Sequence, residues 1–172
     1  ILENELSIIR LDAELKGESP AFPEELSVSH PQAIADQMAI FHAREQQQNA
    51  EMGLLQSQYE QRSREVEELT GRKRQTERSL ALAVEQRNIA APLMQRKIYS
   101  RVDYLGLEQK VVSLQGDIES LASSIPKAQA AAEEAKQRLT LRKAEMEAEI
   151  NAEISKRRTE LNSLKETLAA GG

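Results

Sequence analysis

The chain has 172 residues, of which 3% are aromatic and 30% are charged, and it contains neither tryptophan nor cysteine. The lack of cysteine excludes disulfide bonds and thiolate metal sites, and the shortage of aromatic residues argues against an ordinary compact core. The net charge of −5 comes from interspersed acidic and basic residues without a basic block, so nucleic acid is not an expected partner. This composition is typical of long helices or a coiled coil.

Residues 1–16 are predicted to form a short helix because their apolar residues recur mostly every three to four positions. Gly17 is the expected stop of that helix. Residues 17–31 are predicted to be a connector without continuous helix, since prolines remove backbone donors and fix φ. These prolines are Pro20, Pro23 and Pro31. The last of them is expected near the first turn of the next helix, where proline is tolerated.

Residues 32–96 are predicted to form one long helix with an apolar seam of alternating three- and four-residue steps, sustained for about seven heptads. One seam position falls on Met38, Glu45, Met52, Tyr59, Val66, Lys73, Leu80 and Arg87. The other falls on Phe41, Gln48, Leu55, Arg62, Leu69, Thr76 and Ala83. Because several of these residues are polar, the seam is expected to be softer than an all-apolar one.

Residues 93–101 are predicted to form a turn between two long helices. Pro92 is expected to interrupt the first long helix near residues 88–92, because proline lacks the N–H that a helix interior needs. Ser100 has the chemistry of an N-cap for the following helix, with Asp103 in its first turn.

Residues 101–170 are predicted to form the second long helix. Its seam reads Leu107, Val111, Leu114, Ile118, Leu121, Ile125, Ala128, Ala132, Ala135 and Leu139, and then Met146, Ile150, Ile154, Arg157, Leu161, Leu164 and Leu168. The two four-residue steps from Met146 to Ile154 form a stutter, which locally relaxes a supercoil. At Pro126 a kink or a helix break is expected.

Two long helices with a very short connection are expected to lie antiparallel. The predicted fold class is therefore all-α, a long antiparallel two-helix coiled-coil hairpin with a short additional N-terminal helix. At 1.5 Å per residue, each long helix is expected to be on the order of 100 Å long. A parallel dimeric rod without a hairpin remains an alternative.

A lone helix pair with an alanine-rich seam buries little area, so we expect it to depend on partners. Apolar residues outside the seam support this expectation, although scattered exposed apolar residues are also common on protein surfaces. These residues are Leu54, Leu82, Val84, Leu105, Val112 and Leu141. They are candidates for a second stripe that contacts the first helix or another protomer.

The sequence offers no catalytic constellation, so an enzyme is not expected. His30 and His42 lack further ligands at metal-binding spacing, and there is no glycine-rich phosphate loop. A helix pair also provides no concave pocket that would perturb the pKa values of its many carboxylates. No cofactor or metal is therefore predicted.

The predicted turn is the most informative candidate site, because it combines apolar side chains with three cations. Its residues are Leu93, Arg96, Lys97, Ile98, Tyr99, Ser100 and Arg101. Any turn is polar and needs a cap, but Ile98 and Tyr99 are more apolar than a turn without a binding partner requires. The cations are suited to carbonyl or carboxylate groups of a partner, so the turn is predicted to be a docking site.

The chain resembles the helical region of HlyD-type periplasmic adaptors, the membrane fusion proteins of bacterial type I secretion. Three stretches carry the resemblance. The first is Arg10-Leu11-Asp12-Ala13-Glu14 with Phe22-Pro23-Glu24-Glu25-Leu26, Gln37, Phe41, Ala43 and Arg44. The second runs from Pro92-Leu93 through Ser100-Arg101-Val102-Asp103-Tyr104-Leu105 to Leu114-Gln115-Gly116. The third is Ile125-Pro126-Lys127-Ala128-Gln129 with Glu133, Glu134, Ala135 and Arg138.

The resemblance implies a docking motif of Arg, Leu and Ser at the turn. Leu93 and Ser100 match its spacing, whereas Ile89 stands where the arginine is expected and Lys97 replaces a glycine common at the turn. It further implies a periplasmic location, an inner-membrane anchor in the full-length protein, a TolC-like outer-membrane channel and an inner-membrane ABC transporter as partners, and hexamers of side-by-side hairpins. A generic structural coiled-coil scaffold is the alternative function.

The sequence contains no stretch close to the roughly 20 apolar residues that span a bilayer, and no signal peptide. The chain opens with Ile1, and its first residues have the pattern of a helix interior. We therefore expect it to be a segment of a longer protein whose anchor and targeting signal lie elsewhere.

Overall fold

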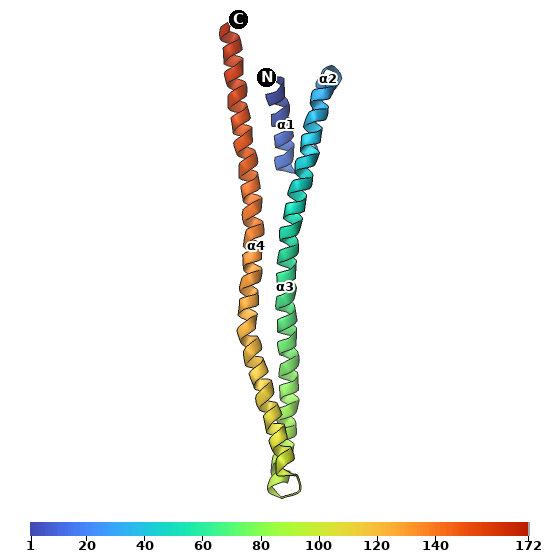
Figure 1. Cartoon of the computed structure of the whole chain (residues 1–172), viewed down its shortest axis with the longest axis vertical. Helices are drawn as coiled ribbons and strands as arrows, with labels where there is room; N and C mark the ends of the chain where they lie inside the picture. The colour runs from blue at the N-terminus through green and yellow to red at the C-terminus, as the bar shows by residue number, and fades with distance from the viewer. Residues whose placement is uncertain (172) are drawn as a thin grey trace. The chain divides into compact units, whose positions relative to one another are not determined.

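The computed structural model describes residues 1–171, which form four helices and no strands. The helices are α1 (Leu2–Lys16), α2 (Glu24–Ser29), α3 (Pro31–Gln95) and α4 (Arg101–Gly171) (Figure 1). The prediction of an all-α hairpin with a short N-terminal helix is confirmed. The chain divides into two compact units, residues 1–56 with residues 137–171, here the terminal unit, and residues 57–136, here the turn unit.

The core of the terminal unit forms where α1 packs against α4. Leu11 is fully buried and packs on Ile150 and Ile154 of α4. Arg157 donates a hydrogen bond to Asn4 over 3.1 Å, further along both helices. Because earlier residues of α1 meet later residues of α4, the two helices run antiparallel, and three-helix packing supplies burial that a bare helix pair lacks.

A salt-bridge group also joins α3 to α4 in the terminal unit. Arg142 of α4 donates hydrogen bonds to Glu51 of α3 over 2.6 Å and to Glu149 of α4 over 3.1 Å. These hydrogen bonds, above all the one to Glu51 and next the one to Glu149, raise the pKa of Arg142 above its ordinary value. The arginine is therefore a fixed positive charge at this position of the hairpin.

Gly17 ends α1, as the sequence predicts. It has φ of 71°, and the N–H groups of Gly17 and Glu18 donate to the carbonyls of Glu14 and Ala13. This is a Schellman motif, in which a left-handed residue closes the helix and satisfies its last carbonyl groups. Glycine adopts this backbone conformation without the steric cost that other residues pay.

The connector contains a short helix that the sequence analysis missed. α2 spans six residues, with Pro23 at its N-cap and Pro31 opening the next helix, α3. The first N–H groups of a helix make no hydrogen bond within the helix, so a proline there removes none. The two prolines therefore mark helix starts and do not break a helix. Proline content alone therefore does not distinguish an irregular connector from short helices with prolines at their ends.

The turn unit is a helix pair formed by parts of α3 and α4 (Figure 1). Val111 and Leu121 of α4 are buried, and so are Ala83 and Ala90 of α3. The remaining α4 seam residues from Leu107 to Ala135 are half-buried, which confirms the predicted periodicity. Small alanines on α3 allow close approach but bury little area, so the pair is thin.

Two charged members of the predicted α3 seam are exposed, whereas its other polar members are half-buried, as most of its apolar members are. Glu45 and Arg62 are exposed, and Arg62 forms a salt bridge with Glu65 on its own helix over 3.4 Å. Since burying an unpaired charge is unfavourable, these side chains turn to water while the helix continues.

Both interior prolines lie within continuous helices, which corrects two expectations. The predicted interruption near Pro92 is wrong, because α3 continues to Gln95 and the N–H of Arg96 still donates to the Pro92 carbonyl over 3.1 Å. Of the two alternatives at Pro126, the break is wrong, since α4 runs through the proline, and the kink stays a prediction. Both prolines and the residues four positions earlier are exposed, so water can satisfy the carbonyl groups that proline leaves unpaired.

Apolar side chains outside the seam remain largely uncovered. Leu54, Leu82, Leu105, Val112 and Leu141 are between 49% and 65% exposed, whereas Val84 is half-buried. These side chains are therefore available for contacts with other proteins.

Across residues 1–171, none of the helices combines the length and the apolar character that crossing a bilayer demands.

Leu11→Ala should reduce the free energy of unfolding by about 2–5 kcal/mol, because it leaves a cavity against Ile150 and Ile154. Leu54→Ala is the matched control, since Leu54 is 60% exposed and its truncation should change stability by less than about 0.5 kcal/mol. Urea denaturation followed by circular dichroism measures both values. Equal effects of the two variants would contradict the packing of α1 described here.

Candidate functional site at the turn

The turn begins with a helix C-cap that contains a lysine in place of the usual glycine. Lys97 has φ of 62°. Within residues 1–171, no other residue besides glycine has a positive φ. Its N–H donates to the Met94 carbonyl over 3.0 Å, and the N–H of Ile98 donates to the Leu93 carbonyl over 2.9 Å. These two hydrogen bonds form a second Schellman motif, so Lys97 occupies the left-handed position that glycine usually fills.

Ser100 closes the other side of the turn, as predicted. Its hydroxyl accepts a hydrogen bond from the N–H of Asp103 over 3.4 Å, and its carbonyl accepts one from the N–H of Tyr104 over 3.0 Å. The hydroxyl satisfies one of the free donors at the start of α4, and Asp103 adds a favourable negative charge in the first turn. The backbone between the two helices is thus fixed at both ends.

The side chains predicted to form the site divide into an exposed and a half-buried group. Arg96, Lys97, Ile98, Ser100 and Arg101 are exposed, and Ile98 is 71% exposed. A Schellman motif often includes an apolar contact from the residue after the left-handed position, but Ile98 keeps most of its surface in water. Three cations and one large apolar side chain are therefore presented together.

Leu93 and Tyr99 belong to the half-buried group and line an open groove of about 310 Å³. The other residues that line it are Gln86, Ile89, Ala90 and Leu107. Sequence reasoning missed the contribution of Leu107, which lies on the opposite helix, although the seam periodicity of α4 marks it. The turn therefore offers an apolar recess beside its exposed cations.

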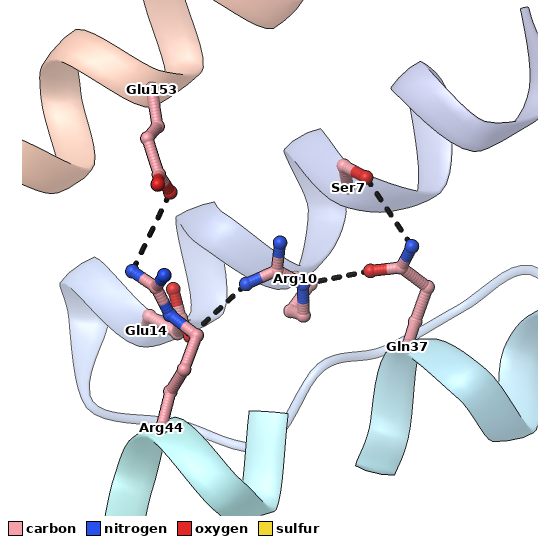
Figure 2. Close-up of polar contacts among 6 residues, drawn as sticks. All are labelled: Ser7, Arg10, Glu14, Gln37, Arg44 and Glu153. Atoms are coloured by element: carbon pink, nitrogen blue, oxygen red, sulfur yellow. Dashed lines mark hydrogen bonds and ion pairs between the residues drawn. The ribbon is translucent and has the colours of Figure 1, made fainter. Parts of the chain in front are cut away.

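A second functional element is a group of buried polar side chains that holds α1 in the terminal unit (Figure 2). Arg10 donates to Gln37 over 2.7 Å and forms a salt bridge with Glu14 over 3.2 Å. Arg44 of α3 bonds the same Glu14 oxygen, Oε1, over 2.7 Å and meets Glu153 of α4 over 3.5 Å. The Glu14 carboxylate thus joins α1 to α3, and Arg44 extends the group to Glu153 of α4.

Burial makes this group depend on its pairing. The Glu14 side chain is 2% exposed, and its second oxygen, Oε2, is buried without a hydrogen-bond partner among residues 1–171. Burial is the main cause that lowers the pKa of Arg10, and the negative charge of Glu14 opposes that effect. Since an arginine stays protonated in proteins, removal of Glu14 would leave a buried unpaired cation.

The buried group explains part of the sequence pattern. Arg10, Glu14, Gln37 and Arg44 all lie in the first stretch on which the family resemblance rests, and here their side chains contact one another. Sequence reasoning did not single out Glu153, because an exposed-looking glutamate on a charged helix carries no distinguishing signal. These residues position α1 against α3 and α4.

The geometry defines a class of protein, a long α-helical hairpin with a short helix packed at the ends of its arms. A family model described as AprE, long alpha-helical hairpin, matches residues 1–171, and the chain therefore belongs to that family. The resemblance to a membrane fusion hairpin that the sequence indicates is thereby confirmed.

Among solved structures, the soluble domain of LipC, a membrane fusion protein of a type I secretion system, has a similar fold. The TM-score is 0.83 at 20% sequence identity, over 98% of this chain and 65% of the LipC chain. This chain thus spans 65% of the length of the solved soluble-domain chain. A comparison with curated protein sequences gives no match.

Glu14→Ala should reduce the free energy of unfolding by about 3–5 kcal/mol, because it strands Arg10 without its partner in a buried environment. Glu68→Ala is the control, since it removes an exposed i, i+4 salt bridge with Arg72 and should cost about 0.5 kcal/mol or less. Thermal and urea denaturation measure both. A Glu14→Ala effect no larger than that of the control would show that the buried group does not hold α1.

Lys97→Gly should raise the free energy of unfolding by about 0.5–1 kcal/mol, because glycine adopts the left-handed backbone without steric cost. The greater conformational freedom of glycine in the unfolded chain offsets part of this gain. Gly17→Ala is the converse control, because it places a residue with a side chain at a φ of 71°, where the backbone is strained. No atom lies within 4 Å of the added carbon, so the strain is the only expected effect. That variant should lower stability by about 1 kcal/mol. A destabilised Lys97→Gly protein would refute the assignment of the cap.

Proposed function

We propose that this chain is the hairpin segment of a periplasmic adaptor in a bacterial type I secretion system. In this proposal the hairpin belongs to a protein anchored in the inner membrane, and that protein bridges an ABC transporter and a TolC-like outer-membrane channel. Family membership over residues 1–171 and the fold shared with LipC support the proposal. The transporter would contact parts of the longer protein, as the resemblance implies.

The turn is the part of this chain that we propose docks the channel. The observation that carries this proposal is Ile98, a large apolar residue 71% exposed beside the exposed cations Arg96, Lys97 and Arg101. Folding does not explain such a surface, because the helix ends are already satisfied by the backbone hydrogen bonds of the cap and by Ser100. A docking partner with an apolar contact point and carbonyl or carboxylate groups would match it.

Neighbouring hairpins are also proposed to associate side by side, in hexamers as the resemblance implies. The exposed leucines and valines outside the seam support self-association, because the thin helix pair leaves these side chains without cover. An assembly of this kind would give each hairpin the burial that its own seam does not provide.

Channel binding tests the docking proposal in the full-length protein. Ile98→Asp should weaken channel affinity by about tenfold or more, because it places a charge in an apolar contact. Leu93→Asp and Ser100→Asp should abolish binding or secretion, and Ser100→Asp retains a side chain that caps α4. Pull-down of the channel and secretion assays measure the effects, and circular dichroism checks that helix content persists.

Val28→Asp provides the matched control, since Val28 is 79% exposed in α2 and does not belong to the turn. It should leave channel binding unchanged. Normal secretion by all three turn variants would show that the turn is not the docking site and would favour a structural coiled-coil scaffold.

A further inference from the structure

Gly71 lies in the interior of α3, where the packing of this chain gives no reason for a glycine. A Cβ at this position would have no atom within 4 Å, so alanine would fit there. Glycine weakens a helix interior relative to alanine, because its backbone loses more conformational freedom on folding. Gly71 therefore lowers the resistance of α3 to bending without improving its packing.

A threonine weakens the next turn of the same helix. The hydroxyl of Thr76 donates to the carbonyl of Arg72 over 2.8 Å. In an α-helix this carbonyl is also the acceptor for the backbone N–H of Thr76, so the hydroxyl competes with a helix hydrogen bond. Such bonds back to the preceding turn often bend helices. Since Arg72 directly follows Gly71, the two weakening features act on one short stretch of α3.

The opposite helix has its own weak point at the same distance from the turn. Gly71 is 24 residues before the end of α3, and Pro126 is 25 residues after the start of α4. With a rise of about 1.5 Å per residue, the two lie at nearly the same height along the helix pair. Pro126 lacks the N–H that would bond the Ala122 carbonyl, so α4 lacks one helix hydrogen bond at this height.

The packing between the two helices changes at the same height. The buried residues of the turn unit, residues 57–136, are Ala83 and Ala90 of α3 with Val111 and Leu121 of α4. All four lie between this height and the turn. On the other side of it, the seam of the described unit consists of half-buried or exposed residues only. The weak points thus lie at the border of the better packed part of the turn unit.

The ion pairs of α3 at this height run along the helix. Arg72 pairs with Glu68 over 2.9 Å, and Lys73 pairs with Glu77 over 3.7 Å. Exposed pairs of this kind contribute little to stability, and these two join residues of a single helix. They therefore do not clamp α3 to α4 where both helices are weakest.

We propose that Gly71, Thr76 and Pro126 form a hinge within the turn unit, at which α3 and α4 bend together. Residues 77–121 move as one body because they hold the buried contacts, and the bend is confined to residues 71–76 and 122–126. A bend in one helix alone would pull the seam apart. Weak points at the same height in both helices let the pair bend while its seam stays closed.

The hinge lets the turn meet a docking partner over a range of angles. This use rests on the docking function proposed above, whereas the hinge itself rests on residues of this chain. Hinges of this kind are short stretches that absorb backbone changes while the packed segments beside them stay intact. The exposed side chains of the turn keep their mutual arrangement during such a movement, because the segment that carries them does not deform.

Hydrogen exchange measured by mass spectrometry on the full-length protein tests the hinge, because it reports local opening of helices. Backbone amides of residues 71–76 and 122–130 should exchange about fivefold faster or more than those of residues 80–90 and 108–118. They should also exchange faster than those of residues 57–66. A rate that changes steadily from the turn to residue 57, without a maximum near residues 71–76, would overturn the proposal.

Two stabilising substitutions should stiffen the hinge. Gly71→Ala should slow exchange of residues 71–76 about fivefold, as the difference in helix propensity indicates. Pro126→Ala restores the N–H that bonds the Ala122 carbonyl and should slow exchange around it at least as much. Gly53→Ala is the matched control, since Gly53 is also an interior glycine of α3 with no atom within 4 Å of an added Cβ. It should leave exchange at residues 71–76 unchanged.

Secretion by the same variants separates a hinge from a merely structural role. Gly71→Ala and Pro126→Ala should each lower secretion about threefold or more although they stabilise the helices, whereas Gly53→Ala should secrete normally. Normal secretion by both stiffened variants would overturn the use of the hinge. Loss of secretion with Gly71→Ala but not with Pro126→Ala would indicate a contact surface at Gly71 and also overturn it.

The unmodified full-length protein shows whether the docking function or the hinge has failed. If it neither binds the channel nor supports secretion, the proposed function is wrong, and the exchange profile still decides whether the hinge exists. If it secretes but lacks the exchange maximum, the hinge is wrong and the proposed function stands.

Discussion

The packing of α1 onto both long helices is the constraint on which the terminal unit depends. Leu11 fills the space against Ile150 and Ile154, Glu14 pairs with Arg44 of α3, and Arg44 in turn meets Glu153 of α4. A helix pair whose contacts are mainly small or polar side chains buries little apolar area. α1 therefore supplies apolar burial that the two long helices alone lack in this unit.

The polar part of that packing gives specificity more than it gives stability. Apolar contacts alone would tolerate α1 at several positions along the groove between two long helices, since the groove repeats every few residues. The buried Glu14 pairs with Arg44 of α3 at the observed position, and a shift of α1 along the groove would separate these two charges. Buried ion pairs contribute little net stability but strongly disfavour mismatched arrangements, so this group fixes the position of the short helix.

Helix periodicity and end signals were readable in the sequence, whereas contacts between distant residues were not. The α4 seam, the stop at Gly17 and the cap at Ser100 follow from local rules and are confirmed. The hydrogen bond from Arg10 to Gln37 joins residues 27 positions apart, and no local rule predicts such pairs. The expected interruption at Pro92 was wrong because the helix continues past a proline whose unpaired carbonyl partner, at Asn88, is exposed to water.

The turn unit shows how a thin helix pair can devote apolar residues to other proteins. Its buried seam uses small residues such as Ala83 and Ala90 on α3, while larger residues such as Ile89 and Ile98 remain exposed. A sequence selected only for an isolated hairpin would place the larger residues inside, because burial stabilises in proportion to area. The observed distribution lets the two helices approach closely and leaves substantial apolar surface outside.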